Sequence, residues 1–206
     1  MQCSCEKADG CQESKRHPVT FVMFGYGLGN SPSLINAAKQ LVEAGYAIDF
    51  VTCGTYLGEP AFNDPHIRIH DLTRPEQRQS GTSAISTWAS LFGKLRGLAE
   101  RIVPLPYRIR RTENLLCRSI AAFANDAGEI VEKSRPMCLI GVEPAGLMAA
   151  ALLSQQRQRP VVYYNLELHH KPDLKTAREF AFWGIEKRHS GFADFTITLD
   201  RERAKL

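Results

Sequence analysis

Residues that could do chemistry gather at three points of the sequence, and the first point is a glycine turn. The hexapeptide Gly25-Tyr26-Gly27-Leu28-Gly29-Asn30 directly follows an apolar run over residues 19–24. Glycines accept positive φ angles and let a ligand approach the backbone, and a helix that starts after the turn favours anions. We therefore expect this turn to line a substrate or phosphate site, the alternative being a tight turn that binds nothing.

The turn does not match the dinucleotide-binding fingerprint. That fingerprint needs a third glycine where Asn30 stands, and an acid after the second strand, where the sequence has Cys53-Gly54. A site for NAD or FAD is therefore disfavoured.

The other two points carry acids and histidines. Glu143 stands before Pro144 after an apolar run, and its carboxylate could accept hydrogen bonds from sugar hydroxyls or cap the next helix. Glu167, His169 and His170 follow another apolar run. A histidine titrates near neutral pH and a nearby carboxylate can fix its tautomer, so an acid/base or orienting role is one interpretation and exposed loop histidines are the other. No HExxH pattern accompanies them, and we expect no metal.

A basic stretch lies between these points, over residues 94–118. It holds seven basic residues against the two acids Glu100 and Glu113. A basic amphipathic helix can lie on anionic lipid, although a helix packed on a core with a solvated charged face gives the same pattern. We expect membrane contact through Trp88, Lys94, Arg101, Arg108, Arg110 and Arg111. The net charge of +4 is too small and diffuse to indicate a nucleic-acid partner, and no basic-aromatic repeat is present.

Short apolar runs that alternate with helical periodicity predict the elements that hold these residues. Strands are expected at residues 19–24, 47–53, 67–70, 137–142, 161–165 and 195–199. Helices are expected at residues 32–44, 83–103, 113–134, 145–156 and 177–190, the last opened by a capping box from Thr176 to Glu179. Strands joined through helices indicate a Rossmann-like parallel sheet with helices on both faces. Ligands bind beyond the carboxyl ends of such strands, where all three points should converge.

The cysteines and the length of the apolar segments indicate the cellular compartment of the protein. Cys3, Cys5 and Cys11 lie in a polar tail over residues 1–17 that has no apolar stretch, and they are expected to be solvated there. Cys53, Cys117 and Cys138 lie in apolar surroundings and indicate buried thiols of a reducing compartment. The most apolar run, residues 137–153, is broken by Glu143 and Pro144. We expect a cytoplasmic protein.

Several of these segments together resemble the N-terminal domain of GT-B glycosyltransferases of the family-4-like type. They are the glycine turn, the basic helical insertion, Tyr163-Tyr-Asn-Leu-Glu-Leu168, and an Ala193-Asp194 pair followed by a strand, Asp200 and Arg203-Ala204. The resemblance covers roughly residues 18–206 and rests more on the order of the motifs than on any one of them.

The resemblance implies two Rossmann-like domains facing each other across a cleft, with a nucleotide-diphosphate sugar as donor substrate and no other cofactor. The N-terminal domain takes the acceptor, lipid-linked or saccharide, and often carries a basic, apolar surface that reaches the membrane. Applied to this sequence, the substrate-binding residues would be Gly25, Gly27, Gly29, Asn30, Glu143 and His170, and the catalytic ones His169 and Glu167.

One departure from the family concerns its second domain. The carboxylate pair that the family spaces eight positions apart does not occur here, and the sequence stops where a helix would begin. The expectation is a fragment or one half of a larger transferase, inactive by itself and lacking the donor domain. The alternatives are a membrane-recruiting half of a split transferase and a nucleotide-binding Rossmann module of another class.

Overall fold

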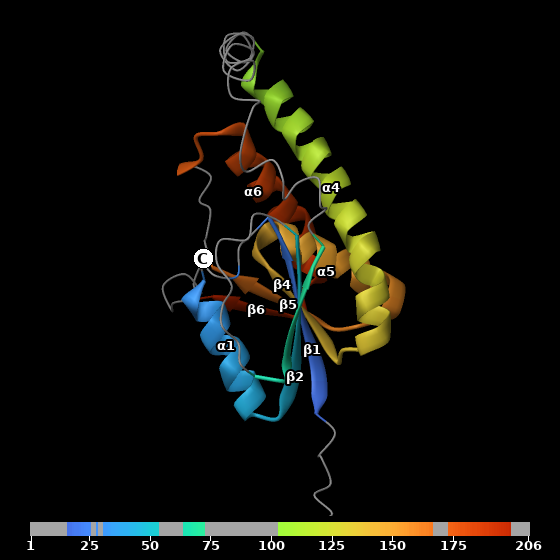
Figure 1. Ribbon diagram of the computed structural model, residues 1–206. Helices are drawn as coiled ribbons and strands as arrows, with labels where there is room; N and C mark the ends of the chain where they lie inside the picture. Colours follow the sequence, from blue (N-terminus) through green and yellow to red (C-terminus); the bar gives the residue numbers. More distant parts are fainter. Residues whose placement is uncertain are drawn as a thin grey trace, which may run out of the picture.

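The computed structural model describes residues 16–25, 28, 31–53, 64–72, 103–166 and 173–198. Six strands form one sheet: β1 (His17–Phe24), β2 (Tyr46–Cys53), β3 (Ile67–Asp71), β4 (Cys138–Val142), β5 (Val161–Asn165) and β6 (Phe195–Thr198). The helices are α1 (Pro32–Glu43), α4 (Leu105–Ser134), α5 (Glu143–Arg157) and α6 (Ala177–His189), followed by the short 3-10 helix η3 (Ser190–Phe192). Figure 1 labels most of these elements.

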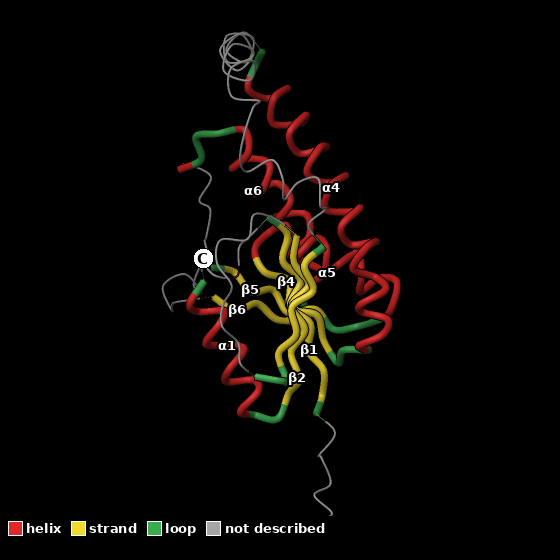
Figure 2. The backbone as a smooth tube through the Cα atoms, viewed as in Figure 1, coloured by secondary structure: helices red, strands yellow, loops and turns green. Residues whose placement is uncertain are grey.

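All five strand pairs are parallel, and the strand order is β3-β2-β1-β4-β5-β6. This is the doubly wound Rossmann order, in which the chain reverses direction across the sheet between β1 and β4. The predicted fold class, a parallel α/β sheet, is therefore confirmed. The twist of the sheet is visible in Figure 2, where the strands fan out around a common centre.

Helices cover both faces, as predicted (Figure 1). On one face α1 buries its apolar stripe against β1 and β2, where Phe21 and Phe50 stack with ring centroids 4.8 Å apart. On the other face α4, α5 and α6 share one core with the alternate strand residues, among them Val22 and Tyr163. The alternation along β1, with Phe21 on one face and Val22 on the other, follows from the two-residue period of a strand.

Helix ends follow the predicted signals in most places. Pro32 opens α1, but the Ser31 hydroxyl contacts the Ser33 hydroxyl at 3.2 Å instead of capping the helix. The capping box of α6 is complete, because Thr176 accepts from the Glu179 N–H and Glu179 accepts from the Thr176 N–H.

Some boundaries differ from the prediction for identifiable reasons. Helix α4 begins at Leu105 instead of residue 113, with Pro106 in its first turn, where the N–H that proline lacks would have no helical partner anyway. β1 begins at His17, so the strand includes the last residue of the predicted tail. Residues 1–15 and the helix expected at 83–103 lie outside the described residues.

The three described cysteines are free thiols and are partly buried, so the burial predicted for them is less complete than expected. Burial still raises the pKa of the Cys117 and Cys138 thiols above the ordinary value. Within the described ranges, no helix is long and apolar enough to cross a membrane.

Two glycines let α5 contact the sheet through its backbone. A Cβ atom on Gly141 of β4 would lie 2.7 Å from the Leu147 Cα atom, and one on Gly146 would overlap the carbonyl oxygen of Val22 in β1. The start of α5 therefore rests directly on β1 and β4. This contact fixes the position of Glu143, the first residue of α5.

Candidate functional site

The carboxyl edge of β1 opens to solvent at Gly25. This residue is exposed, has φ +69°, and no atom would lie within 4 Å of an added Cβ. Its N–H donates to the Cys53 carbonyl at the end of β2 at 2.6 Å. The first residue of the turn is thus fixed to the sheet and leaves open space beside its backbone. The other turn residues predicted to bind substrate, Gly27, Gly29 and Asn30, lie outside the described residues.

Leu28 and Ser31 hold the far end of the turn. Leu28 is fully buried in the core under α1, and its carbonyl accepts from the Ser31 N–H at 3.1 Å. The turn is therefore held at its start by the hydrogen bond of Gly25 to β2, and near its end by the burial of Leu28 next to the amino end of α1.

Glu143 occupies the carboxyl end of β4 in a strained conformation. It is 9% exposed and has φ +60°, the left-handed region that residues other than glycine rarely adopt. Its Oε1 atom accepts a hydrogen bond of 2.7 Å from the Leu166 N–H, just beyond the end of β5. The N-cap residue of α5 is Val142, whose side chain makes no capping hydrogen bond, and Glu143 Oε1 binds a different segment. Capping of α5 by the Glu143 carboxylate stays a prediction. The contact with sugar hydroxyls stays a prediction.

A second buried acid, Glu186 of α6, contacts the end of β5. The Asn165 amide nitrogen donates to Glu186 Oε1 of α6 at 3.1 Å, and both residues are less than a tenth exposed. Tyr163, two residues earlier on the strand, is buried as well. Burial raises the pKa of its hydroxyl far above the ordinary value, and the carboxylates of Glu186 and Glu143 raise it further.

Sequence reasoning singled out Glu143 but missed the residues that form a polar cluster with it, Tyr163, Asn165 and Glu186. The signal present was an asparagine that ends a β-branched and aromatic run, where an apolar residue is usual. Glu186 gave no signal, because a glutamate in a helix is ordinarily solvated.

The predicted acid/base residues Glu167, His169 and His170 lie outside the described residues. The segment that carries them starts at Leu166, which is buried and is held by Glu143. Its point of departure is therefore the same sheet edge as Gly25. In the part of the chain that the structure describes, no three histidines, cysteines or acids come together as they would around a metal ion.

Asp49 forms a separate charged cluster in the middle of β2. Its buried carboxylate accepts two hydrogen bonds from the Arg68 guanidinium, each 2.9 Å long, and contacts His70 Nε2 at 2.8 Å. The partners lie on the edge strand β3, two strands away from β1 and the switch point between β1 and β4. This arrangement compensates a buried charge and ties β3 to β2.

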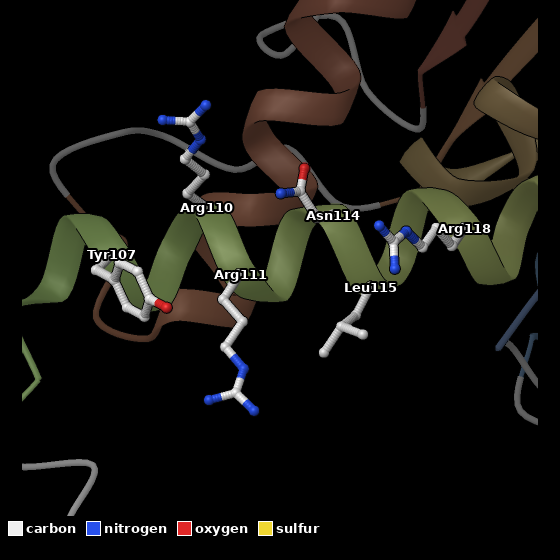
Figure 3. A pocket seen from close by; sticks show the side chains of 6 residues that line it. All are labelled: Tyr107, Arg110, Arg111, Asn114, Leu115 and Arg118. Carbon is white, nitrogen blue, oxygen red and sulfur yellow. The ribbon is translucent and has the colours of Figure 1, made fainter.

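Of the residues predicted to contact a membrane, Arg108, Arg110 and Arg111 lie in the first half of α4. Trp88, Lys94 and Arg101 are outside the described residues. Arg110 and Arg111 are exposed, whereas Arg108 is partly buried, so the three do not share one surface. Figure 3 shows Arg110 and Arg111 among the residues of a groove along this helix.

The strand order and the helices on both faces of the sheet define a Rossmann-like α/β domain. No protein-family model and no curated protein matches the sequence. Among solved structures, the calicheamicin glycosyltransferase CalG4 is 15% identical with a TM-score of 0.47, and the match covers 85% of this chain and 38% of that one.

Two further solved structures are similar at the same level. The glycosyltransferase SnogD from Streptomyces nogalater is 18% identical with a TM-score of 0.49, over 90% of this chain and 44% of that one. LpCGTa, solved in complex with UDP, is 12% identical with a TM-score of 0.42, over 73% and 30%. The chain thus spans less than half the length of each. The fold class rests on the strand order and not on these likenesses.

Proposed function

We propose that this chain is the acceptor-side domain of a cytoplasmic two-domain glycosyltransferase of GT-B architecture. In this proposal a hexose passes from a nucleotide-diphosphate sugar to a saccharide or lipid-linked acceptor in the synthesis of a polysaccharide or glycoconjugate. The donor would be bound by a second domain, in the same chain or in another, and this domain alone would not catalyse transfer.

The observation that carries the proposal is the carboxyl edge between β1 and β4. Gly25 leaves open space beside its backbone, and Glu143 holds the exit of β5 on the same edge. Ligands of open α/β sheets bind at this switch point. The order of motifs that resembles the family-4-like enzymes selects sugar transfer among the chemistries that such an edge supports.

The residues that follow the strands at this edge would have the following roles. A histidine at position 169, oriented by Glu167, would take the proton of the attacking acceptor hydroxyl as a general base. The backbone of the glycine turn, with Asn30, would contact phosphate and sugar oxygens, and His170 would bind substrate. Glu143 would hold the segment that begins at Leu166, and its carboxylate would also accept hydrogen bonds from sugar hydroxyls.

An NMR titration of the isotope-labelled chain tests the proposal. UDP-sugars, GDP-sugars, saccharide acceptors, NAD and FAD are added in separate experiments, and amide shifts are followed at Gly25, Leu28, Ser31 and Leu166. We expect these amides to shift with a nucleotide sugar or a saccharide and to stay unchanged with NAD and FAD. Tight dinucleotide binding with no response to nucleotide sugars or saccharides would overturn the proposal.

A matched pair of variants controls for backbone strain. Gly25 and Gly45 have φ angles of +69° and +91°, and an added Cβ meets no atom within 4 Å at either position. Gly25→Ala places a methyl group in the proposed site, whereas Gly45→Ala applies similar strain at the amino end of β2. Ligand-induced shifts should be lost in Gly25→Ala and kept in Gly45→Ala. Equal loss in both variants would remove the turn from the site.

One observation favours the split-transferase alternative. Edge strand β6 exposes Phe195 by 70% and Ile197 by 43%, an apolar surface that a partner chain could cover. In that case a donor-binding chain would associate through β6, and Phe195→Asp would abolish the association. The saccharide response at Gly25 would then be absent in the isolated domain, which separates the two candidates.

A further inference from the structure

Six exposed residues in the first half of α4 form a stripe. They recur at intervals of three, one, three, one and three positions, which is the spacing of one helical face. They also line a groove of about 360 Å³, as Figure 3 shows: Tyr107, Arg110, Arg111, Asn114, Leu115 and Arg118.

The charge of this stripe is not balanced within the described residues. Arg110, Arg111 and Arg118 form no ion pair with any carboxylate there. The acid in this half of the helix, Glu113, is turned toward α6, where it pairs with Arg188. Within the described residues, the three guanidinium groups therefore have no counter-charge, and Figure 3 shows the Arg110 and Arg111 side chains extending to opposite sides of the helix.

Neither packing nor helix stability requires these arginines. One turn further along, the same exposed face of α4 carries Ala121, Ala122 and Asn125, so the helix packs on the core equally well without cations. The helix has no acid in its first turn, so nothing there offsets cations near the positive end of its dipole. The next exposed cation on the helix is Lys133, fifteen positions beyond Arg118, so the three arginines form a local cluster at the groove.

The geometry suits a compact anion with an apolar neighbour. Arg110 and Arg118 lie eight residues apart, about 12 Å along the helix axis, so their long side chains can converge on an anion above Asn114. Guanidinium groups bind phosphate oxygens in a bidentate manner. Tyr107 and Leu115, exposed by 61% and 56%, offer apolar surface beside the charges.

We propose that this groove on α4 is a binding site for a phosphate group, with Arg110 and Arg118 as its ligands and Arg111 adding positive charge from the other side of the helix. Asn114 donates a further hydrogen bond, and Tyr107 and Leu115 contact the apolar part of the molecule that carries the phosphate. The site is distinct from the carboxyl edge and does not depend on sugar transfer. The phosphate comes either from a lipid headgroup or from a soluble compound.

Two probes distinguish these sources. Inorganic pyrophosphate is titrated by calorimetry, and vesicles of phosphatidylglycerol and phosphatidylcholine are tested by flotation against vesicles of phosphatidylcholine alone. Arg110→Gln/Arg118→Gln should weaken binding of whichever probe binds by roughly 25-fold, about fivefold for each arginine near an anionic surface. Loss of two unrelated charges, in Lys39→Gln/Lys175→Gln, should change it less than twofold because those exposed lysines lie on α1 and just before α6.

Further variants separate a built site from diffuse attraction. Arg110→Lys/Arg118→Lys keeps the charge and loses the bidentate geometry, so binding should still fall severalfold. Tyr107→Ala/Leu115→Ala should reduce vesicle binding and leave pyrophosphate binding unchanged. All these residues are exposed, so circular dichroism melting should show a folded protein in each case. The proposal is overturned if neither probe binds, if the lysine control weakens binding equally, or if the arginine-to-lysine variant binds normally.

Discussion

At Glu143 we expect a glycine substitution to leave a more stable protein than an alanine substitution, the reverse of the usual order in a helix. In an ordinary helix position glycine is about 1 kcal/mol less favourable than alanine. Glu143 is the first residue of α5 but has φ +60°, a conformation that costs a residue with a Cβ about 1–2 kcal/mol and costs glycine nothing. Alanine retains that strain, and glycine removes it.

Both substitutions also remove the carboxylate that accepts from the Leu166 N–H at 2.7 Å. Losing a charged acceptor from a buried donor costs about 1.5–3 kcal/mol, so Glu143→Ala should lose about that much stability. In Glu143→Gly the relief of about 1–2 kcal/mol is reduced by about 0.5–1 kcal/mol of extra chain entropy. The glycine variant should therefore be more stable than the alanine variant by about 0.5–1 kcal/mol.

Urea unfolding followed by circular dichroism measures both differences. Glu129, an exposed residue of α4 five positions before the end of the helix, provides the matched control, where Glu129→Ala should be more stable than Glu129→Gly by about 1 kcal/mol. Amide exchange at Leu166 should accelerate in both variants at position 143, and Glu143→Gln should largely retain its protection because it keeps an acceptor oxygen. The reasoning is refuted if alanine is the more stable residue at position 143.

Three further predictions concern stability. Gly146→Ala forces a methyl group against the Val22 carbonyl, so thermal unfolding should show a loss of about 1–3 kcal/mol, and an unchanged melting temperature would contradict the close contact. Thr176→Ala removes the capping bond to the Glu179 N–H and should cost about 1 kcal/mol by urea unfolding, whereas Thr176→Ser should cost little. Because the folded-state pKa of Tyr163 is raised, its stabilising contribution is complete below the unfolded value near pH 10 and decreases as pH rises above it. Between pH 10 and 11 the free energy of unfolding of the unmodified protein should fall by up to about 1.4 kcal/mol per pH unit more steeply than that of Tyr163→Phe. If the free energies of the two proteins change in parallel with pH, the burial of this hydroxyl is contradicted.

Most of the fold could be predicted because its signals are local. The run that became β5 was predicted residue for residue, since β-branched and aromatic residues end at a polar one. The capping box of α6 was predicted in the same way, because all its partners lie within four residues. The start of α4 was placed too late, since prolines were treated as breaks when one of them occupies the first turn.

The polar cluster could not be predicted, because its contacts join segments distant in the chain. The bond from Leu166 to Glu143 spans 23 positions, and the one from Asn165 to Glu186 spans 21. Nothing local distinguishes Glu143 as left-handed, since a residue before proline usually adopts an extended conformation. Only the register of β4 against β5 brings the Glu143 carboxylate to the Leu166 amide.

The backbone contact between α5 and the sheet has a consequence for how this protein can change over generations. Where a helix rests on side chains, substitutions in the two layers can compensate one another by exchanging volume. At Gly141 and Gly146 there is no side chain to exchange, so a change at either position has no local suppressor. Glu143 lies between these two positions, and an altered residue there cannot be accommodated by sliding α5. In a mutational scan, residues 141–146 should therefore form a short block of intolerance, and adaptation to a new ligand should proceed through the loops beyond the sheet edge.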